Sequence, residues 1–347
     1  MKKIVILMSA VATLTMVACG GSDEPANTNP QPQPEPAVVY DGAYTPGAQI
    51  ATIEQDETTE TWEWADGLLQ SIVAETDESS INEYTFAYND KKQMTQMSMT
   101  IQQMPVKVDY SYTGRHLTSV TATSNGTNLL DGTITHNADG LITQVDLELD
   151  STMADYLTSM MGNFMDGDSM PDDMLATATK GAVPSKMAVD KLTVHYDITW
   201  QGKNIASYIN TTTFQMSFTA DELLSLPGFD TMLSEYAALI EMFVPEGTMV
   251  PLSFTMSDTN EFTYDNHPNP LQGLLRGLEP SSLSANNILT EHKRTGASIS
   301  INLGFLPAMP IPGNEESHGY NYQYNEAGYP TEVSIDGEPT IKYTYQQ

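Results

Sequence analysis

The feature that most constrains the fold is a regular spacing of aromatic or histidine residues, each followed by a polar turn. Around each one, apolar and polar residues alternate, as in WEWADGLLQSI and YSYTGRHLTSV, which is the period of a β-strand. Asp66-Gly67 and Gly114 supply the positive φ that tight hairpin turns need. The first four of these anchor residues are Trp64, Tyr88, Tyr112 and His136, a constant step of 24 residues. One step accommodates two strands of about nine residues with their turns, so the pattern predicts a long antiparallel meander.

The meander is interrupted further along the chain. Later anchors, Trp200, Tyr264 and Tyr324, follow at longer intervals. Two insertions, near 151–180 and 219–246, carry methionines and other apolar residues at helical spacing and are predicted to be amphipathic helices. Such helices must bury their apolar stripe, either as a cap that fills the lumen of the sheet or as an adaptable lid over a ligand. We therefore predict a mainly β fold of about fifteen strands, curled into an open or closed barrel because closure removes edge strands.

The N-terminus has the features of a targeting segment. Lys2 and Lys3 precede an apolar run that is too short to span a bilayer, and residues 1–18 are predicted to be a signal peptide. Small residues just before Cys19 resemble the lipobox of bacterial lipoproteins, in which the cysteine becomes the acylated first residue. Cys19 is the only cysteine in the chain. The sequence thus predicts lipidation at Cys19, no disulfide framework and a membrane contact through acyl chains.

Residues 19–46 are predicted to be a linker between this anchor and the fold. Prolines at 25, 30, 32, 34 and 36 favour an extended spacer of roughly 40–50 Å at about 3.1 Å per residue. Ser22-Asp23-Glu24 resembles the surface-export tag of Bacteroides-type lipoproteins, but its two acids leave both the cell surface and the periplasmic face open. The predicted location is the outer membrane, and residues 47–347 form the predicted barrel domain.

The strand pattern also resembles known repeats and a known family. The unit with Tyr110, Tyr112, Gly114 and Leu117 resembles the tyrosine–aspartate repeats of Rhs-type and teneurin-type proteins. Together with the lipobox and the segment FTYDNHPNPLQGLL, the chain resembles a family of Bacteroides-type lipoproteins of unknown function with a porin-like β fold. The resemblance covers about residues 50 to 347. It implies a porin-like barrel and no particular activity.

The composition argues against several classes of function. The net charge is −31, with 14 basic and 45 acidic residues, so nucleic acid is not an expected partner. The six histidines are scattered without a metal-binding pattern. In the acidic stretch FMDGDSMPDD, Met170 and Pro171 stand where a calcium loop needs an oxygen ligand and a glycine. No hydrolase, phosphate-binding or dinucleotide motif is present. The sequence predicts no catalytic residue, no metal and no cofactor, and therefore a protein that is not an enzyme.

Aromatic residues form stripes along the predicted strands. Such a stripe can stack on sugar rings or apolar ligands, but aromatic residues also pack well across half-buried sheet faces. The candidate ligand-stacking residues are Trp62, Trp64, Tyr110, Tyr112, Trp200, Tyr322 and Tyr324.

We therefore expect a non-enzymatic, lipid-anchored envelope protein that binds a glycan or a small apolar molecule. The alternative is a structural or assembly partner of an outer-membrane protein complex. An unfilled lumen with mixed aromatic and polar lining would favour the first hypothesis. A filled lumen with an exposed apolar patch outside would favour the second.

Overall fold

The computed structural model describes residues 41–76, 81–101, 104–150, 189–225, 247–276, 278–301 and 308–346, with a few single residues between them. In the described part, the strands join in one 17-stranded antiparallel sheet. The strands are β1 (Ile50–Gln55), β2 (Thr58–Ala65), β3 (Leu68–Thr76), β4 (Ile81–Tyr88), β5 (Met94–Ile101), β6 (Met104–Thr113), β7 (His116–Ser124), β8 (Thr127–His136), β9 (Ile142–Leu149), β10 (Val189–Gln201), β11 (Asn204–Thr219), β12 (Met249–Pro268), β13 (Asn286–Ile301), β14 (Met309–Ile311), β15 (Glu315–Tyr324), β16 (Pro330–Ile335) and β17 (Glu338–Tyr345).

The sheet closes on itself. β1 pairs with both β2 and β17, β9 pairs with β10, and β13 pairs with β15. These pairings make a closed antiparallel barrel of 16 strands, and the short β14 extends the sheet only beside β13. The predicted fold class, mainly β with a curled meander, is confirmed, and the barrel is closed rather than open.

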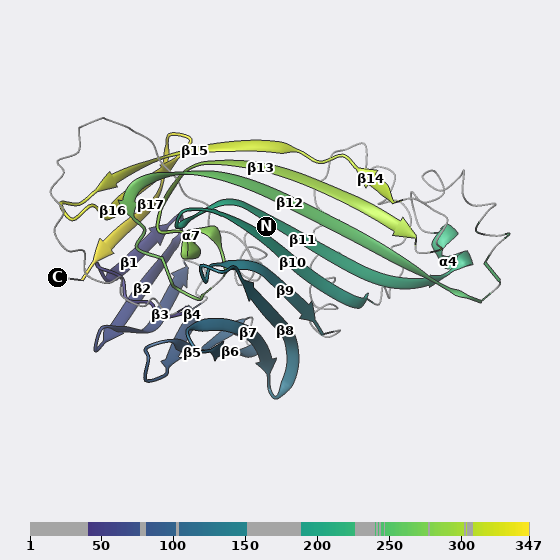
Figure 1. Ribbon diagram of the computed structural model, residues 1–347, viewed down its shortest axis with the longest axis horizontal. Coiled ribbons are helices and arrows are strands. Elements are labelled where there is room, and N and C mark those ends of the chain that lie inside the picture. The colour runs from purple at the N-terminus through teal and green to yellow at the C-terminus, as the bar shows by residue number, and fades with distance from the viewer. Residues whose placement is uncertain are drawn as a thin grey trace.

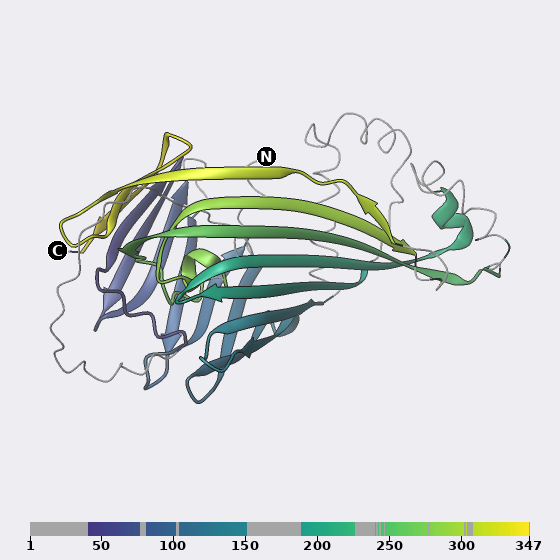
Figure 2. The same ribbon diagram turned by 45° about the horizontal axis from the view of Figure 1, so that its top comes forward.

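The wall of the barrel has two unequal parts. β10 to β13 contain 13 to 20 residues each, whereas β2 to β9 contain 8 to 10. Figures 1 and 2 show the long strands extending well beyond the short ones. The helix α4 (Ala220–Ser225) follows β11 at their far end.

Each anchor residue coincides with an irregularity in the strand register. Trp64, Tyr88, Tyr112 and His136 are the last or next-to-last residues of β2, β4, β6 and β8. In every one of these hairpins the register shifts between the anchor and the residue before it. The same shift occurs at the three later anchors, Trp200, Tyr264 and Tyr324. A bulge re-aims a side chain and bends its strand, so the anchors mark where each hairpin curves near its turn.

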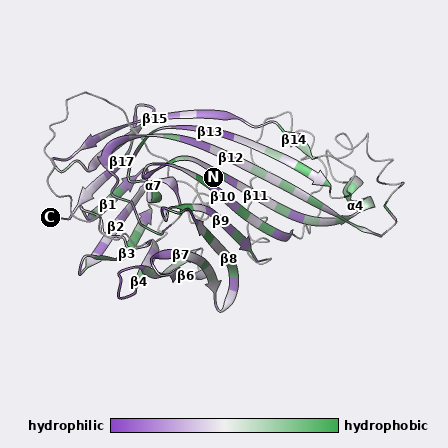
Figure 3. Cartoon of the chain, in the orientation of Figure 1, coloured by the Kyte–Doolittle hydropathy of each residue, from purple (hydrophilic) through white to green (hydrophobic). Residues whose placement is uncertain are grey.

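The alternation along the strands determines which face is apolar. In β9, Val145 and Leu147 are buried, while Asp146 and Glu148 are exposed. The same alternation runs through β6 and β10, and Figure 3 shows it as changing hydropathy along β10. The buried side chains face the lumen. Tyr110 of β6, for example, donates its hydroxyl hydrogen bond to Leu275 O, which belongs to the connection between β12 and β13 inside the barrel. Membrane-spanning barrels carry the opposite pattern, apolar outside and polar inside.

A connection between β12 and β13 folds into the lumen. This lumenal segment comprises residues 269–276 and 278–285 and contains the short helix α7 (Pro280–Leu283). Figure 1 shows α7 within the ring of strands. Two tyrosines of the wall strands and one from the stretch before β1 donate hydroxyl hydrogen bonds to its carbonyl oxygens. They are Tyr44 to Pro270 at 2.8 Å, Tyr110 to Leu275 at 2.5 Å and Tyr208 to Leu278 at 3.2 Å.

The lumenal segment begins with turns instead of a helix. Asn269 and Pro270 resemble a helix start in sequence, but the Asn269 side chain accepts the backbone N–H of Leu271 at 3.0 Å in a local turn. The helix begins later, with Pro280 in its first turn. The three tyrosines that donate to its carbonyl oxygens hold the lumenal segment in place, so tertiary contacts decide its conformation.

Several predicted features lie outside the described residues. They are the signal peptide 1–18, the linker as far as residue 40, the insertion near 151–180 and most of the insertion near 219–246, of which α4 is described. Among the described residues, none of the helices combines the length and apolar character needed to cross a membrane.

Candidate functional site

A cavity of about 100 Å³ lies between the lumenal segment and the barrel wall. Its wall residues come from β1, β2, β13 and β15–β17, so strands from both ends of the sequence meet there. The lining residues are Ile53, Gln55, Thr58, Glu60, Trp62, Asn269, Pro270, Leu271, Leu274, Arg276, Glu279, Ser281, Ser282, Asn286, Asn287, Ile288, Tyr322, Pro330, Ile341 and Tyr343.

One side of the cavity is aromatic and aliphatic. Trp62 is 2 % exposed, and its ring lies 6.4 Å from that of Trp64 in a nearly parallel arrangement. Tyr343 and Ile341 of β17 are also buried there. Burial raises the pKa of Tyr343 above its ordinary value, so this hydroxyl stays neutral. This side of the cavity offers ring faces and methyl groups to an apolar body.

The other side of the cavity carries an ion pair. Arg276 Nη1 of the lumenal segment lies 2.7 Å from Glu60 Oε1 of β2, and its guanidinium lies 5.4 Å from the centre of the Tyr84 ring. The two side chains are only 20 % and 15 % exposed. Burial opposes the charge of Arg276, but Glu60 outweighs it and raises the pKa of the guanidinium. The pair therefore joins the lumenal segment to β2 by a largely buried salt bridge.

A second carboxyl lies near the same guanidinium. Glu279 is the N-cap residue of α7, and its Oε2 accepts a hydrogen bond from the Ser281 hydroxyl at 3.3 Å. Burial raises the pKa of Glu279 to about 6, although Arg276 acts in the opposite direction. Near pH 6 this carboxyl is therefore either a donor or an acceptor. The cavity thus combines an apolar wall with a polar wall that has both hydrogen-bonding modes.

The seven predicted ligand-stacking aromatics all lie on the inner face but have different surroundings. Trp62 and Tyr322 line the cavity. The others bind protein groups: Trp64 donates to Ile50 O at 2.7 Å, Trp200 to Ile142 O at 2.6 Å, Tyr110 to Leu275 O and Tyr112 to Met94 O at 2.5 Å, and Tyr324 to Asp265. Trp62 and Tyr322 are therefore the two that a molecule in the cavity would touch. Cys19 lies outside the described residues.

The charged residues of the cavity were not identified from the sequence. Arg276 is one of only 14 basic residues and lies in the apolar stretch LQGLLRGLEP. A rare cation in such a stretch could have indicated a candidate site residue. Its partner Glu60 is distant in sequence, and only barrel closure brings the two together. The structure also brings His116 and His136 together, with ring centres 4.8 Å apart, because neighbouring hairpins have their turns at the same rim.

No protein-family model matches the chain, and no curated protein matches it. Among solved structures, a porin-like protein from Bacteroides vulgatus aligns over 86 % of this chain and 99 % of its own, at 8 % identity and a TM-score of 0.34. A porin-like protein from Bacteroides uniformis aligns over 86 % and 98 %, at 11 % identity and a TM-score of 0.28. At these values the likeness adds nothing to what the chain's own strands show.

Proposed function

We propose that this protein is a non-enzymatic, lipid-anchored binding protein of the outer membrane that holds a small molecule in its barrel lumen. The observation that carries the proposal is the lumenal cavity, with its aromatic side at Trp62 and Tyr322 and its ion pair at Glu60 and Arg276. Binding sites for small molecules combine a largely apolar lining with a few placed polar groups. The ligand class that fits is a molecule with an apolar body or sugar face and one polar group.

The polarity of the barrel supports a tethered role rather than a pore. Its outward positions are largely threonine, serine and charged residues, as in Asp146 and Glu148 of β9, and its inward positions are apolar. The lumenal segment occupies part of the lumen and is held by hydrogen bonds from three tyrosines. The lipobox-like sequence ending at Cys19 supports attachment through acyl chains.

A thermal-shift screen tests the proposal. The chain beginning at Cys19, with Cys19→Ser to prevent acylation, is mixed with oligosaccharides, polysaccharides, bile acids and fatty acids. A ligand at about 100 times its dissociation constant adds about 2.7 kcal/mol of stability and raises Tm. We expect a saturable shift with one ligand class.

Two neighbouring threonines provide a matched pair for locating the ligand. Thr58 lines the cavity, whereas Thr59 is the next residue of the same strand and is exposed on the outer face. Thr58→Leu fills cavity space and is expected to abolish the ligand shift, while Thr59→Leu retains it. A flat screen, or equal loss in both variants, would contradict binding in the cavity. Pull-downs from envelope extracts would then test the alternative of an outer-membrane protein partner.

A further inference from the structure

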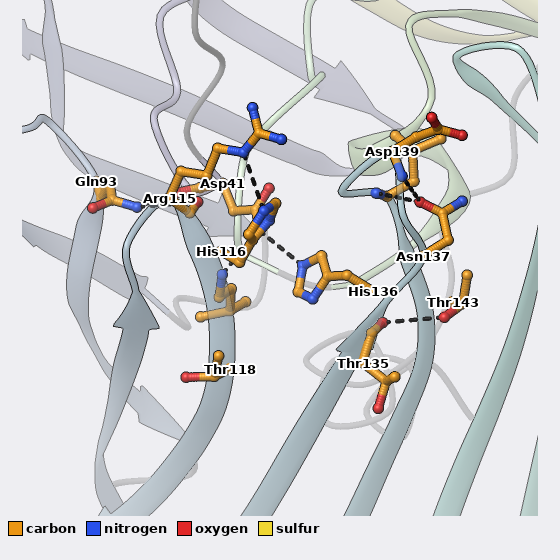
Figure 4. Close-up of polar contacts among 12 residues, drawn as sticks. Asp41, Gln93, Arg115, His116, Thr118, Thr135, His136, Asn137, Asp139 and Thr143 are labelled. Atoms are coloured by element: carbon orange, nitrogen blue, oxygen red, sulfur yellow. Dashed lines mark hydrogen bonds and ion pairs between the residues drawn. The ribbon is translucent and has the colours of Figure 1, made fainter.

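Outside the lumen, three metal-ligating side chains meet at the rim of the barrel. Asp41 is the first residue that the structure describes and lies near the end of the predicted linker, His116 begins β7, and His136 ends β8. The backbone N–H of Asp41 donates to Arg115 O at 2.9 Å, and Gln93 Nε2 donates to Asp41 O at 3.2 Å. Figure 4 shows the three side chains pointing toward one another from these separate segments.

The ligand atoms of the three side chains are close enough to share one ion. Asp41 Oδ2 lies 2.9 Å from His136 Nε2 and 3.5 Å from His116 Nδ1, and all three atoms lie within 4.8 Å of one another. Tetrahedral zinc with bonds of about 2.0–2.1 Å separates its nitrogen and oxygen ligands by roughly 3.3 Å. Small side-chain rotations therefore suffice, and a fourth position stays open for water.

A second observation points to a ligand at this cluster. His116 Nδ1 is buried and is the one buried side-chain nitrogen or oxygen in the described part of the chain without a hydrogen-bond partner. A buried polar atom left unpaired is costly, and this one faces the Asp41 carboxylate. Gly140 makes room for the ring, because a Cβ at this position would lie 2.5 Å from His116 Cε1.

The surrounding groups hold the ligands in place. The Leu117 backbone N–H donates to Asp41 Oδ2 at 2.8 Å, as hydrogen-bond donors commonly do for metal-binding carboxylates. Arg115 Nε donates to His116 Nε2 at 3.1 Å, which places the histidine proton on Nδ1. A metal at Nδ1 requires the proton on Nε2 instead, so the exposed Arg115 must turn away when the metal binds.

We propose that Asp41, His116 and His136 bind a divalent transition-metal ion of the zinc class through Oδ2, Nδ1 and Nε2. Imidazole and carboxylate ligands suit zinc and its neighbours. The ion fastens the end of the linker to the turns of two hairpins, so it couples the tether to the barrel. This site is separate from the lumenal cavity, and its test does not depend on the proposed ligand.

The test is a zinc titration of the chain beginning at Cys19, with Cys19→Ser to remove its only thiol. Affinity is measured by competition with a chromophoric chelator at pH 7.5. We expect one site that Asp41→Asn and His136→Gln each weaken more than about 10-fold. Asp41→Asn keeps an oxygen to accept the Leu117 N–H, so the local fold is retained. Arg115→Gln is expected to tighten binding, because it removes a competing cation.

His195 supplies the control. Its two ring nitrogens contact different carboxylates, Asp146 at 2.6 Å and Asp197 at 3.1 Å, on the outer face. His195→Gln should therefore leave zinc affinity unchanged. If the parent chain binds zinc no more tightly than Asp41→Asn, or if His195→Gln weakens binding equally, the rim cluster is a hydrogen-bonded contact only and the proposal fails.

Discussion

Carboxyl groups outside and inside the barrel have opposite electrostatic surroundings. In the exposed turn between β16 and β17, the Gly319 N–H at 2.7 Å and His318 Nδ1 at 2.9 Å lower the pKa of Asp336. On the inner face, burial raises the pKa of Glu279 and of Glu291, although Tyr320 donates to Glu291 at 2.9 Å. The exposed surface stabilises a charged carboxylate as water does, whereas the lumen does not.

The cations follow the same division. Outside, Arg294 pairs with Glu261 and Lys191 with Glu148, and these side chains are 40 % to 61 % exposed. Inside, Arg276 pairs with Glu60 at 20 % and 15 % exposure. A buried pair is weak support for stability, because desolvation offsets its attraction. Stability therefore does not explain the Glu60–Arg276 pair, whereas contact with the polar group of the proposed ligand would explain it.

The largest expected effect comes from breaking the inner pair. Arg276→Leu leaves Glu60 in the lumen without its guanidinium, so the free energy of unfolding should fall by about 3–5 kcal/mol. Chemical denaturation measures it. The double variant Glu60→Gln/Arg276→Leu removes the stranded charge and should recover most of the loss. A loss below about 1 kcal/mol in the single variant would mean that the pair behaves like a surface pair.

The next effect concerns the attachment of the lumenal segment. Tyr110→Phe leaves the Leu275 carbonyl without its donor and should cost about 1–3 kcal/mol. Hydrogen exchange of the segment's amides should also become faster. Tyr112→Phe is the comparison, because its hydroxyl binds Met94 O in the wall and not the segment. Equal acceleration in both variants would argue against a segment held by Tyr110.

A smaller effect depends on pH. The pKa of Glu279 is raised to about 6 from an ordinary value near 4.5, so the folded state binds its proton more tightly than the unfolded state. The stabilisation is complete below the unfolded-state pKa and is lost as pH rises through the folded-state pKa, so stability should fall by about 2 kcal/mol between about pH 3.5 and about pH 7. Glu279→Gln keeps an oxygen to accept from the Ser281 hydroxyl and should lose this dependence. If the difference in the free energy of unfolding between Glu279→Gln and the parent stays constant across this pH range, the pKa of Glu279 is not raised.

The smallest effect is expected outside. Arg294→Leu breaks the exposed pair with Glu261 and should change the free energy of unfolding by at most about 1 kcal/mol. Arg294→Leu and Arg276→Leu make the same substitution in an Arg–Glu pair. They differ in that the first pair is exposed on the outside and the second lies in the lumen. If the two variants cost the same, the contrast between the faces is wrong.

Local sequence information was sufficient for the hairpins. Alternation, turn glycines and the anchors at Trp64, Tyr88, Tyr112 and His136 act within a few residues, and each anchor indeed ends or nearly ends its strand. The inward direction of Trp62 and Tyr110 also follows from alternation once one face is known to be apolar.

The sites depend on contacts between distant segments, which the sequence alone did not reveal. Arg276 meets Glu60 because β1 pairs with β17 and closes the ring around the lumenal segment. Asp41 reaches His116 and His136 because the chain crosses the rim before entering β1. Asn269 and Pro270 resemble a helix start in sequence, but the chain turns there, and Tyr44, which is distant in sequence, holds the Pro270 carbonyl.

The central claim is that this barrel turns its apolar face inward and is held to the membrane only by its acyl chains. It is tested by replacing residues 1–19 with a cleavable secretory signal and washing the envelope with alkaline carbonate. The account predicts that the barrel is released into the soluble fraction, because its outer face is polar. Retention in the membrane pellet would contradict it and would indicate an inserted barrel.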